Sequence, residues 1–209
     1  MNGAERVRSR MVARQLRRRG IADERVLGAM ERVPREAFVP PELVEHAYDD
    51  AALPIGEAQT ISQPYIVAAM CELLALDGSE TVLDIGTGSG YAAAVLDELA
   101  AAVVSVEVVP ELAERARAAL AATGHSTVDV RLGDGRAGAP DRAPFDAIAV
   151  AAATAAVPPA LVDQLALGGR LVVPLGDRRG QQLVRLEKTE HGLAETRSVA
   201  CRFVPLVRA

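Results

Sequence analysis

Cysteine and histidine are scarce in this chain of 209 residues. The two cysteines, Cys71 and Cys201, lie far apart and match no metal-binding or redox spacing. The three histidines are scattered along the sequence. We therefore expect no structural metal, and a reducing cytoplasm is the expected location.

Long apolar runs and lysine are also lacking. The longest apolar stretch, residues 147–160, is rich in alanine and contains two consecutive prolines near its end, so no membrane span is expected. The charged N-terminus lacks the apolar core of a signal peptide. Lys188 is the only lysine, and the net charge of −5 argues against general binding of polyanions.

Apolar strands and amphipathic helices alternate along most of the sequence. We expect strands ending near residue 85 and at 103–107, 128–132, 145–150 and 169–174, and helices at 64–76, 92–99, 110–123 and 159–167. Strands that are apolar on both faces and alternate with helices indicate a parallel sheet covered on both sides. The sequence thus predicts a Rossmann-like, doubly wound α/β fold, with antiparallel strands in 183–186 and 198–207.

The first 55 residues have a different, helical pattern. Apolar residues recur with helical spacing over 4–19, and Gly20 follows as a stop. Asp23 can cap a second short helix, after which prolines interrupt the chain. We expect one domain over 1–209, with residues 1–55 as a helical cap and 56–209 as the core and C-terminal strands.

Seven arginines lie within residues 6–19, where Glu5 is the one neighbouring acid. Such a cluster suits either an RNA or acidic-partner surface or the solvated face of an amphipathic helix. The segment has no aromatic residues for base stacking, and its apolar stripe is intact. We favour the solvated face and expect no nucleic-acid partner.

A glycine-rich loop follows the first core strand. Gly86, Gly88 and Gly90 separate this strand from a helix, the context in which such glycines bind a cofactor. Glu107 ends the next strand and can accept hydrogen bonds from both ribose hydroxyls of a nucleoside. In a doubly wound sheet these strand ends meet at the ligand site.

The spacing of the loop argues against a dinucleotide. Its glycines follow G-x-G-x-G, and Tyr91 stands where a dinucleotide fingerprint has its third glycine. Asp84 would repel a pyrophosphate and attract a cationic amino group, such as that of S-adenosylmethionine. Asp134, between two glycines after the third strand, can accept a hydrogen bond from the adenine amine.

The chain resembles the protein-L-isoaspartate O-methyltransferase family in its bacterial form over nearly its full length. The more selective motifs are Q-T-I-S-Q-P (59–64) and R-F-V-P-L-V (202–207). Motifs shared with many methyltransferases are V-L-D-I-G-T-G-S-G-Y (82–91), S-V-E (105–107) and G-D-G (133–135), and the resemblance continues through 143–148 and 161–176.

The resemblance implies an enzyme that transfers a methyl group from S-adenosylmethionine to the α-carboxylate of L-isoaspartyl residues in damaged proteins. The ester then closes to a succinimide, which hydrolyses partly to normal aspartate. Ser62 is the expected catalytic residue. The expected cofactor-binding residues are Gln59, Thr60, Ile61, Asp84, Gly86, Thr87, Gly88, Ser89, Gly90, Glu107, Asp134 and Gly135. The expected substrate-binding residues are Thr60, Ile61, Ser62, Val204 and Val207.

Ser62 has no histidine nearby to activate it, and this chemistry needs none. A carboxylate nucleophile, with a reference pKa of about 3.3–4, is already ionised at neutral pH. A neutral hydroxyl can orient it without opposing the loss of charge during transfer. An acyl-transfer role fails because no G-x-S-x-G elbow is present. Ser62 could also cap the helix that begins near Pro64, and we expect some of both roles.

Two departures from the family pattern bear on substrate preference. Ala58 stands where glycine is expected, and the segment 151–158 is unusually rich in alanine. One alternative function is methylation of aspartate in a dedicated natural-product precursor peptide. Another is a catalytically silent cofactor-binding module. We expect isoaspartyl proteins as partners, no membrane association and a monomer.

Overall fold

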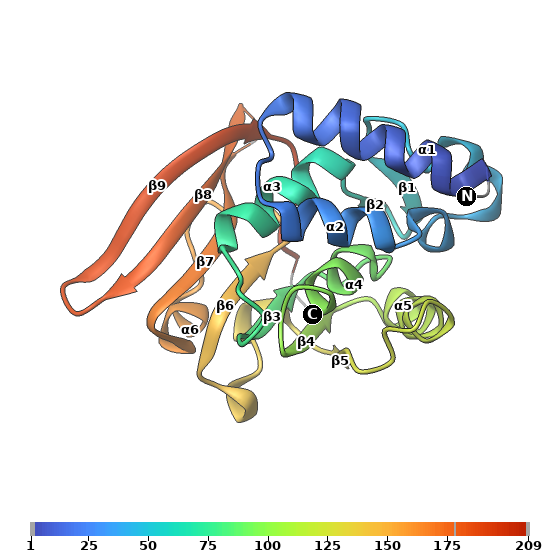
Figure 1. Ribbon diagram of the computed structural model, residues 1–209. Coiled ribbons are helices and arrows are strands. Elements are labelled where there is room, and N and C mark those ends of the chain that lie inside the picture. Colours follow the sequence, from blue (N-terminus) through green and yellow to red (C-terminus); the bar gives the residue numbers. More distant parts are fainter. Residues whose placement is uncertain (1–2, 178, 208–209) are drawn as a thin grey trace.

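The computed structural model describes residues 3–177 and 179–207. Its main feature is a seven-stranded sheet (Figure 1), in which neighbouring strands are parallel from β5 to β7 and antiparallel from β7 to β9. In spatial order the strands are β5 (Asp129–Leu132), β4 (Ala102–Glu107), β3 (Thr81–Ile85), β6 (Phe145–Val150), β7 (Leu165–Asp177), β8 (Gly180–Thr189) and β9 (Gly192–Cys201). The predicted doubly wound fold is confirmed.

Two buried clusters of apolar side chains cover the two faces of the sheet. The larger cluster joins one face to α2 (Glu24–Arg32), α3 (Pro64–Leu74), α4 (Tyr91–Asp97) and α5 (Pro110–Ala122). The smaller cluster joins the other face to α6 (Pro159–Asp163), through Leu161. Figure 1 shows α6 well separated from the helices of the first face. Strand order reverses beside β3, whose neighbours are β4 and β6.

The N-terminal segment is helical, as predicted. It comprises α1 (Gly3–Met11), a π-helical turn η1 (Val12–Leu16), a 3₁₀ turn η2 (Arg17–Arg19), and, after α2, the 3₁₀ turns η3 (Arg35–Phe38) and η4 (Pro41–His46). Gly20 ends the first helix with a φ of 98°, and the Asp23 side chain caps α2 by accepting from the backbone amide of Arg25. Buried side chains of α1, η1 and α2 belong to the larger cluster.

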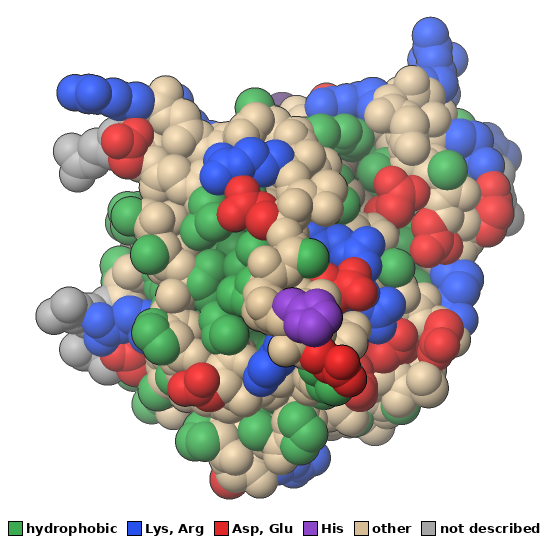
Figure 2. All heavy atoms as spheres, turned by 90° about the vertical axis from the view of Figure 1, so that its left-hand side faces the viewer, with side chains coloured by type: hydrophobic (Ala, Val, Ile, Leu, Met, Phe, Trp, Pro, Cys, Tyr) green, Lys and Arg blue, Asp and Glu red, His purple; other side chains and the backbone are tan. Residues whose placement is uncertain are grey.

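N-terminal arginines form ion pairs with acidic side chains of the described residues. Their partners, in chain order for Arg8, Arg17 and Arg19, are Glu36, Glu24 and Asp50. On the face drawn in Figure 2 positive and negative side chains are interspersed. Among the described residues no helix has the length and apolarity needed to cross a bilayer.

The predicted helix at 159–167 is too long. The helix ends at Asp163, and Leu165 already pairs with Phe145 on β6. Lys188 on β8 stabilises the junction between α6 and β7. Its Nζ donates to the carbonyl oxygens of Val162 at 2.9 Å and Leu165 at 2.7 Å. An ammonium group that satisfies the last carbonyls of a helix stabilises its C-terminal end.

The predicted strand at 198–207 is also wrong in its second half. Strand β9 ends at Cys201, opposite Gln181 near the first residue of β8, so the ladder has almost no partner left beyond this pair. Pro205 has no N–H to continue it. The final residues instead form a separate bridge between Pro205 and Ala153. We call residues 202–207 the C-terminal segment.

A short hairpin that the sequence analysis missed precedes α3. Strands β1 (Leu53–Gly56) and β2 (Gln59–Ile61) are joined through Glu57 and Ala58, whose φ values are 51° and 54°. Positive φ at both loop residues is the pattern of a type I′ turn, which favours glycine or asparagine. The position of Ala58 therefore does require a positive φ, as the expectation of glycine there implied.

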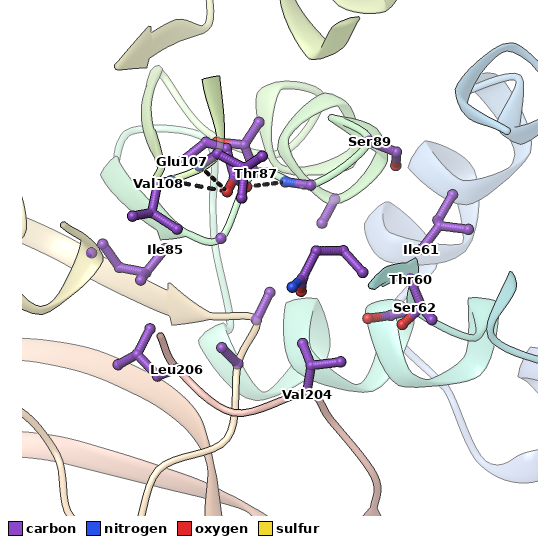
Figure 3. A pocket seen from close by; sticks show the side chains of 18 of the residues that line it. Thr60, Ile61, Ser62, Ile85, Thr87, Ser89, Glu107, Val108, Val204 and Leu206 are labelled. Carbon is purple, nitrogen blue, oxygen red and sulfur yellow. Dashed lines mark hydrogen bonds between the residues drawn. The ribbon is translucent and has the colours of Figure 1, made fainter. Parts of the chain in front are cut away.

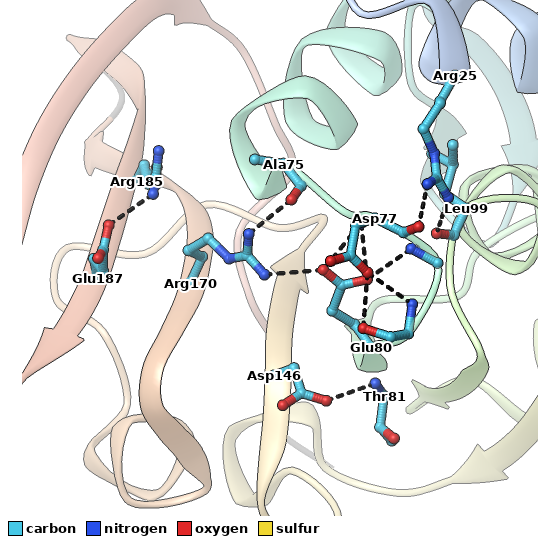
Figure 4. A network of polar contacts seen from close by, with 12 residues as sticks. Arg25, Ala75, Asp77, Glu80, Thr81, Leu99, Asp146, Arg170, Arg185 and Glu187 are labelled. Atoms are coloured by element: carbon cyan, nitrogen blue, oxygen red, sulfur yellow. Dashed lines mark hydrogen bonds and ion pairs between the residues drawn. The ribbon is translucent and has the colours of Figure 1, made fainter.

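A polar network lies at the end of the sheet opposite to the carboxyl ends of the parallel strands (Figure 4). Glu80, which is 5% exposed, accepts hydrogen bonds from the backbone amides of Asp77 and Gly78 and pairs with Arg170 of β7 at 3.1 Å. Arg170 also donates to the carbonyl oxygen of Ala75, just after α3. The network joins α3, β3 and β7 far from the carboxyl ends of the strands.

Candidate active site

A cavity lies at the carboxyl ends of β3, β4 and β6, where the strand order reverses. Doubly wound sheets bind their ligands at such a switch point. The cavity brings together most of the predicted site residues, from parts of the chain far apart in sequence: 59–62, 86–89, Glu107, Gly135, Val204 and Val207. In Figure 3 the side chains of Thr60 and Ser62 lie on the opposite side of this cavity from Ile85 and Leu206.

Glu107 supports the glycine loop and also lines the cavity. One carboxylate oxygen accepts from the backbone amide of Gly88 at 2.7 Å, and the other accepts from Val108 at 2.9 Å and Val109 at 3.0 Å (Figure 3). The side chain is 5% exposed. Each carboxylate oxygen has two lone pairs, so Glu107 retains acceptor capacity toward the cavity.

Gly135 lets the backbone pass close to Ile85, which lines the cavity. A Cβ built on this residue would lie 2.5 Å from Cγ2 of Ile85, a contact that real side chains do not make. The three loop glycines, Gly86, Gly88 and Gly90, all have positive φ, as a tight turn from strand to helix requires. Gly90 faces away from the cavity, where a Cβ would crowd Ala116 of α5 at 3.3 Å.

Asp84 is fully buried beneath the glycine loop and is absent from the wall of the main cavity. Its Oδ2 accepts from Ser105 at 2.7 Å, and the Ser105 hydroxyl lies 2.5 Å from that of Thr87. Its Oδ1 has no hydrogen-bond partner among the described residues. Burial, reinforced by the charge of Glu107, raises the pKa of Asp84 to about 6 despite the hydrogen bond from Ser105.

Asp134 lies next to the cavity without lining it. Its Oδ1 accepts from the backbone amide and from Nε of Arg136, at 3.0 and 2.9 Å, and the two side chains form an ion pair. The contact of Asp134 with adenine therefore stays a prediction, since the structure directs this carboxylate toward Arg136.

Ser62 does not cap α3, so this part of the expectation is wrong. The helix begins at Pro64, which places Gln63 at the N-cap, and no side chain caps this end. The Ser62 hydroxyl makes no hydrogen bond with residues 3–177 or 179–207. It lines the main cavity, a groove on one side of it, and a small hollow that also borders Asp84.

The groove continues from the cavity along α3 and the end of β9. Thr60, Ser62, Ala151 and Val204 line both spaces, so an occupant of one meets an occupant of the other beside Ser62. The remaining lining residues of the groove are Ala52, Gln63, Ile66, Ala200, Cys201, Arg202 and Phe203. The expected peptide-binding residue Val204 thus lies at the boundary.

The C-terminal segment forms one wall of the cavity. Backbone hydrogen bonds to Ala153 hold this wall in place. Ala153 donates its amide to the carbonyl oxygen of Val204 at 2.8 Å and accepts from the amide of Leu206 at the same distance. The alanine-rich segment after β6 therefore holds this wall, and its small side chains at Ala151 and Ala152 line the cavity. These contacts use main-chain atoms, so no residue type in the sequence signalled them.

Several apolar residues that line the cavity were not predicted. Ile85, Val108 and Leu206 each adjoin a predicted site residue, and Val109 lies two positions after Glu107. Their position immediately beside a strand end or within the C-terminal motif was the available signal. Within the described residues no cluster of His, Cys, Asp and Glu is suited to a metal ion.

A doubly wound sheet with a glycine loop after one central strand and a buried acid ending the next defines a nucleoside-binding α/β protein. A family model described as protein-L-isoaspartate(D-aspartate) O-methyltransferase matches residues 7–209. The chain belongs to this family.

Individual relatives agree with this assignment. Protein-L-isoaspartate O-methyltransferase 1 of Syntrophobacter fumaroxidans is 55% identical over 203 residues, which cover 97% of this chain and 95% of the relative. A solved protein-L-isoaspartate O-methyltransferase is 30% identical with a TM-score of 0.86, and the match covers 95% of this chain and 65% of that one. A candidate family member of Plasmodium falciparum, in complex with S-adenosyl-L-homocysteine, shares the fold at 23% identity, with a TM-score of 0.84 over 97% and 99% of the two chains.

Proposed function

We propose that this chain transfers a methyl group from S-adenosylmethionine to the α-carboxylate of L-isoaspartyl residues in damaged proteins and peptides. The observation that carries the proposal is the position of Ser62. Its hydroxyl has no partner within the described chain and lies where the cofactor cavity meets the groove. Family membership supplies the reaction class.

The groove would bind the peptide and the main cavity the cofactor, whose sulfonium supplies an electrophilic methyl group. A carboxylate oxygen of the isoaspartyl residue attacks this methyl carbon, and the electrons of the carbon–sulfur bond pass to sulfur. The products are a methyl ester and a neutral thioether. Ser62 donates one hydrogen bond to the carboxylate and fixes its line of approach. No proton is transferred, which agrees with a serine that has no neighbouring base.

The residues of the cavity fit such a cofactor. Glu107 would accept from the ribose hydroxyls, and the loop 86–89 would contact the amino-acid moiety through its backbone. The orphaned Oδ1 of Asp84 supplies negative potential beneath that loop, which favours a cationic ammonium group. Gln59, Thr60 and Ile61 would cover the cofactor from β2, and Gly135 would admit the adenine ring, with Asp134 beside it.

The C-terminal segment would bind the peptide by strand-like pairing. Backbone pairing tolerates many side chains, which suits a substrate defined by damage rather than by sequence. Val204 and Val207 would line the path of the peptide. We also propose an enzyme of one domain, because side chains of α1, α2 and the sheet share one buried cluster. A cytoplasmic location and a monomeric state are further parts of this proposal.

Methyl incorporation into matched peptides tests the proposal. Each isoaspartyl peptide is compared with its normal aspartyl twin in several unrelated sequences, and mass spectrometry detects a single added methyl. We expect labelling of all isoaspartyl members and none of the twins. Labelling of one aspartyl sequence alone would favour the dedicated-peptide alternative, which family membership does not support. Cofactor binding without any turnover would favour the silent module.

A further inference from the structure

The side chain of Gln181 binds the C-terminal segment at Phe203, through both the N–H and the C=O of that residue. Its Oε1 accepts from the backbone amide of Phe203 at 2.7 Å, and its Nε2 donates to the carbonyl oxygen of Phe203 at 3.3 Å. A carboxamide carries the same acceptor and donor as a peptide group. Gln181 therefore binds Phe203 as a neighbouring strand would.

This contact occurs where the regular ladder ends. Gln181 pairs through its main chain with Cys201, and β8 starts only one residue earlier, at Gly180. No backbone of β8 remains to face Phe203, two residues further along. The side chain of Gln181 supplies the missing pair of hydrogen bonds and extends the sheet by one residue without any strand.

We call these two hydrogen bonds between Gln181 and Phe203 the clamp. The clamp lies beside the place where the cavity meets the groove. Phe203 lines the groove, and Val204, the next residue, lines both spaces. One edge of the segment is fixed by Ala153, which binds Val204 and Leu206. The other edge is fixed by Gln181, so the segment is held from two sides between residues that line the site.

We propose that Gln181 is a positioning residue for the methyl transfer, because it holds the C-terminal segment in the geometry that receives the peptide. The proposal depends on the proposed function for the identity of the peptide. Gln181 itself does not line the main cavity. Removing the carboxamide is expected to weaken peptide binding and leave cofactor binding unchanged.

The first test uses Gln181→Ala, with Gln182→Ala as the matched control. Gln182 is the exposed neighbour on β8, and its side chain makes no hydrogen bond with the described residues. We expect the KM for an isoaspartyl peptide to rise about tenfold in Gln181→Ala, with the Kd for S-adenosylhomocysteine within twofold of wild type. An unchanged KM, or an equal change in both variants, would overturn the proposal.

The second test uses Gln181→Glu across pH. An ionised glutamate accepts from the Phe203 amide but repels its carbonyl oxygen, whereas a protonated carboxyl group can accept and donate like the original amide. The reference pKa of glutamate is about 4.3, so the kcat/KM of the variant relative to wild type should recover as pH falls from about 6 toward 4. A ratio that does not change with pH contradicts the clamp, because a merely structural defect has no reason to titrate.

Hydrogen exchange separates this proposal from the proposed function. The Phe203 amide should lose protection in Gln181→Ala, while amides in the middle of β8 keep theirs. This measurement needs no substrate, so it remains informative if wild-type protein methylates no isoaspartyl peptide. Retained protection at Phe203 would show that Gln181 does not hold the segment.

Discussion

Glu107 accepts a hydrogen bond from the backbone amide of Gly88 over 2.7 Å, which ties the end of β4 to the glycine loop after β3. Its other oxygen accepts from Val108 and Val109. Both oxygens are thus acceptors toward the protein, and the same side chain borders the cavity. The geometry of the glycine loop and the proposed recognition of ribose consequently depend on the same carboxylate.

Glu107→Gln should weaken cofactor binding. The amide NH₂ must face a backbone N–H, because every protein group around the carboxylate is a donor. We expect the Kd for S-adenosylhomocysteine to rise at least tenfold by calorimetry, since a hydrogen bond to a charged group contributes roughly 1.5–3 kcal/mol. Glu111→Gln, at the exposed start of α5, is the control. An unchanged Kd would show that the ribose assignment is wrong.

Ser62→Ala should reduce turnover with little effect on cofactor affinity. The hydroxyl has no structural partner in the described chain, so its removal leaves no protein group unsatisfied. We expect kcat on an isoaspartyl peptide to fall about 100-fold, comparable to the loss of one positioned donor in other active sites. The Kd for S-adenosylhomocysteine should stay within twofold. Turnover equal to that of a distant control, Ser198→Ala, would refute the role.

Asp84→Asn should raise stability at neutral pH while impairing cofactor binding. The pKa of Asp84 is about 6 in the fold against a model value of 3.8, so the folded state binds more protons between these values. Stability contributed by this group therefore falls as pH rises from about 4 to 6. We expect the variant to gain on the order of 2 kcal/mol at pH 7 in denaturant titrations, less near pH 4. A gain independent of pH would contradict this account.

Glu80→Gln should show the opposite dependence on pH. Burial alone would raise the pKa of Glu80, but the amides of Asp77 and Gly78, together with Arg170, outweigh burial and hold it below its usual value. The stabilisation of the fold by ionised Glu80 is fully present above its unfolded-state pKa of 4.5. It is lost as pH falls through its lower pKa in the folded state. We expect a loss of about 1–3 kcal/mol at pH 7, narrowing in acid. The same denaturant titrations measure it.

Ala58→Gly should stabilise the β1–β2 hairpin. At a φ of 54° the Cβ of alanine is strained by about 1–2 kcal/mol, and the greater chain entropy of glycine offsets part of this gain. We expect a net increase of up to about 1 kcal/mol in the free energy of unfolding. Ala121→Gly, at an exposed helical position of α5, should lose about 1 kcal/mol instead. Equal losses in both variants would contradict the strain.

Periodicity and turn residues sufficed to predict the sheet and the position of Glu107 at a strand end. The carboxyl ends of adjacent parallel strands lie at the same edge of the sheet. The predicted strand ends were therefore enough to place Gly86 and Gly135 beside one site. The predicted end of α6 was wrong because alanine and leucine suit either a helix or a strand. Pairing of Leu165 with Phe145 makes this residue part of β7 instead.

Other parts of the site depend on contacts between distant segments. The clamp of Gln181 on Phe203 spans 22 positions, and the bridge from Ala153 to the C-terminal segment uses only backbone atoms. Neither leaves a periodic trace. Ser62 was singled out by its motif, but whether its hydroxyl would cap α3 depended on a one-residue difference in where the helix begins.

The only lysine of the chain, Lys188, has its ammonium group enclosed by carbonyl oxygens at the junction of α6 and β7. Amine-selective reagents consequently have one side-chain target here, and acylation of that target requires its amine to leave the carbonyl oxygens. The rate of modification of Lys188 is thus a built-in single-site reporter of local opening beside the sheet, obtained without engineering a label into the protein.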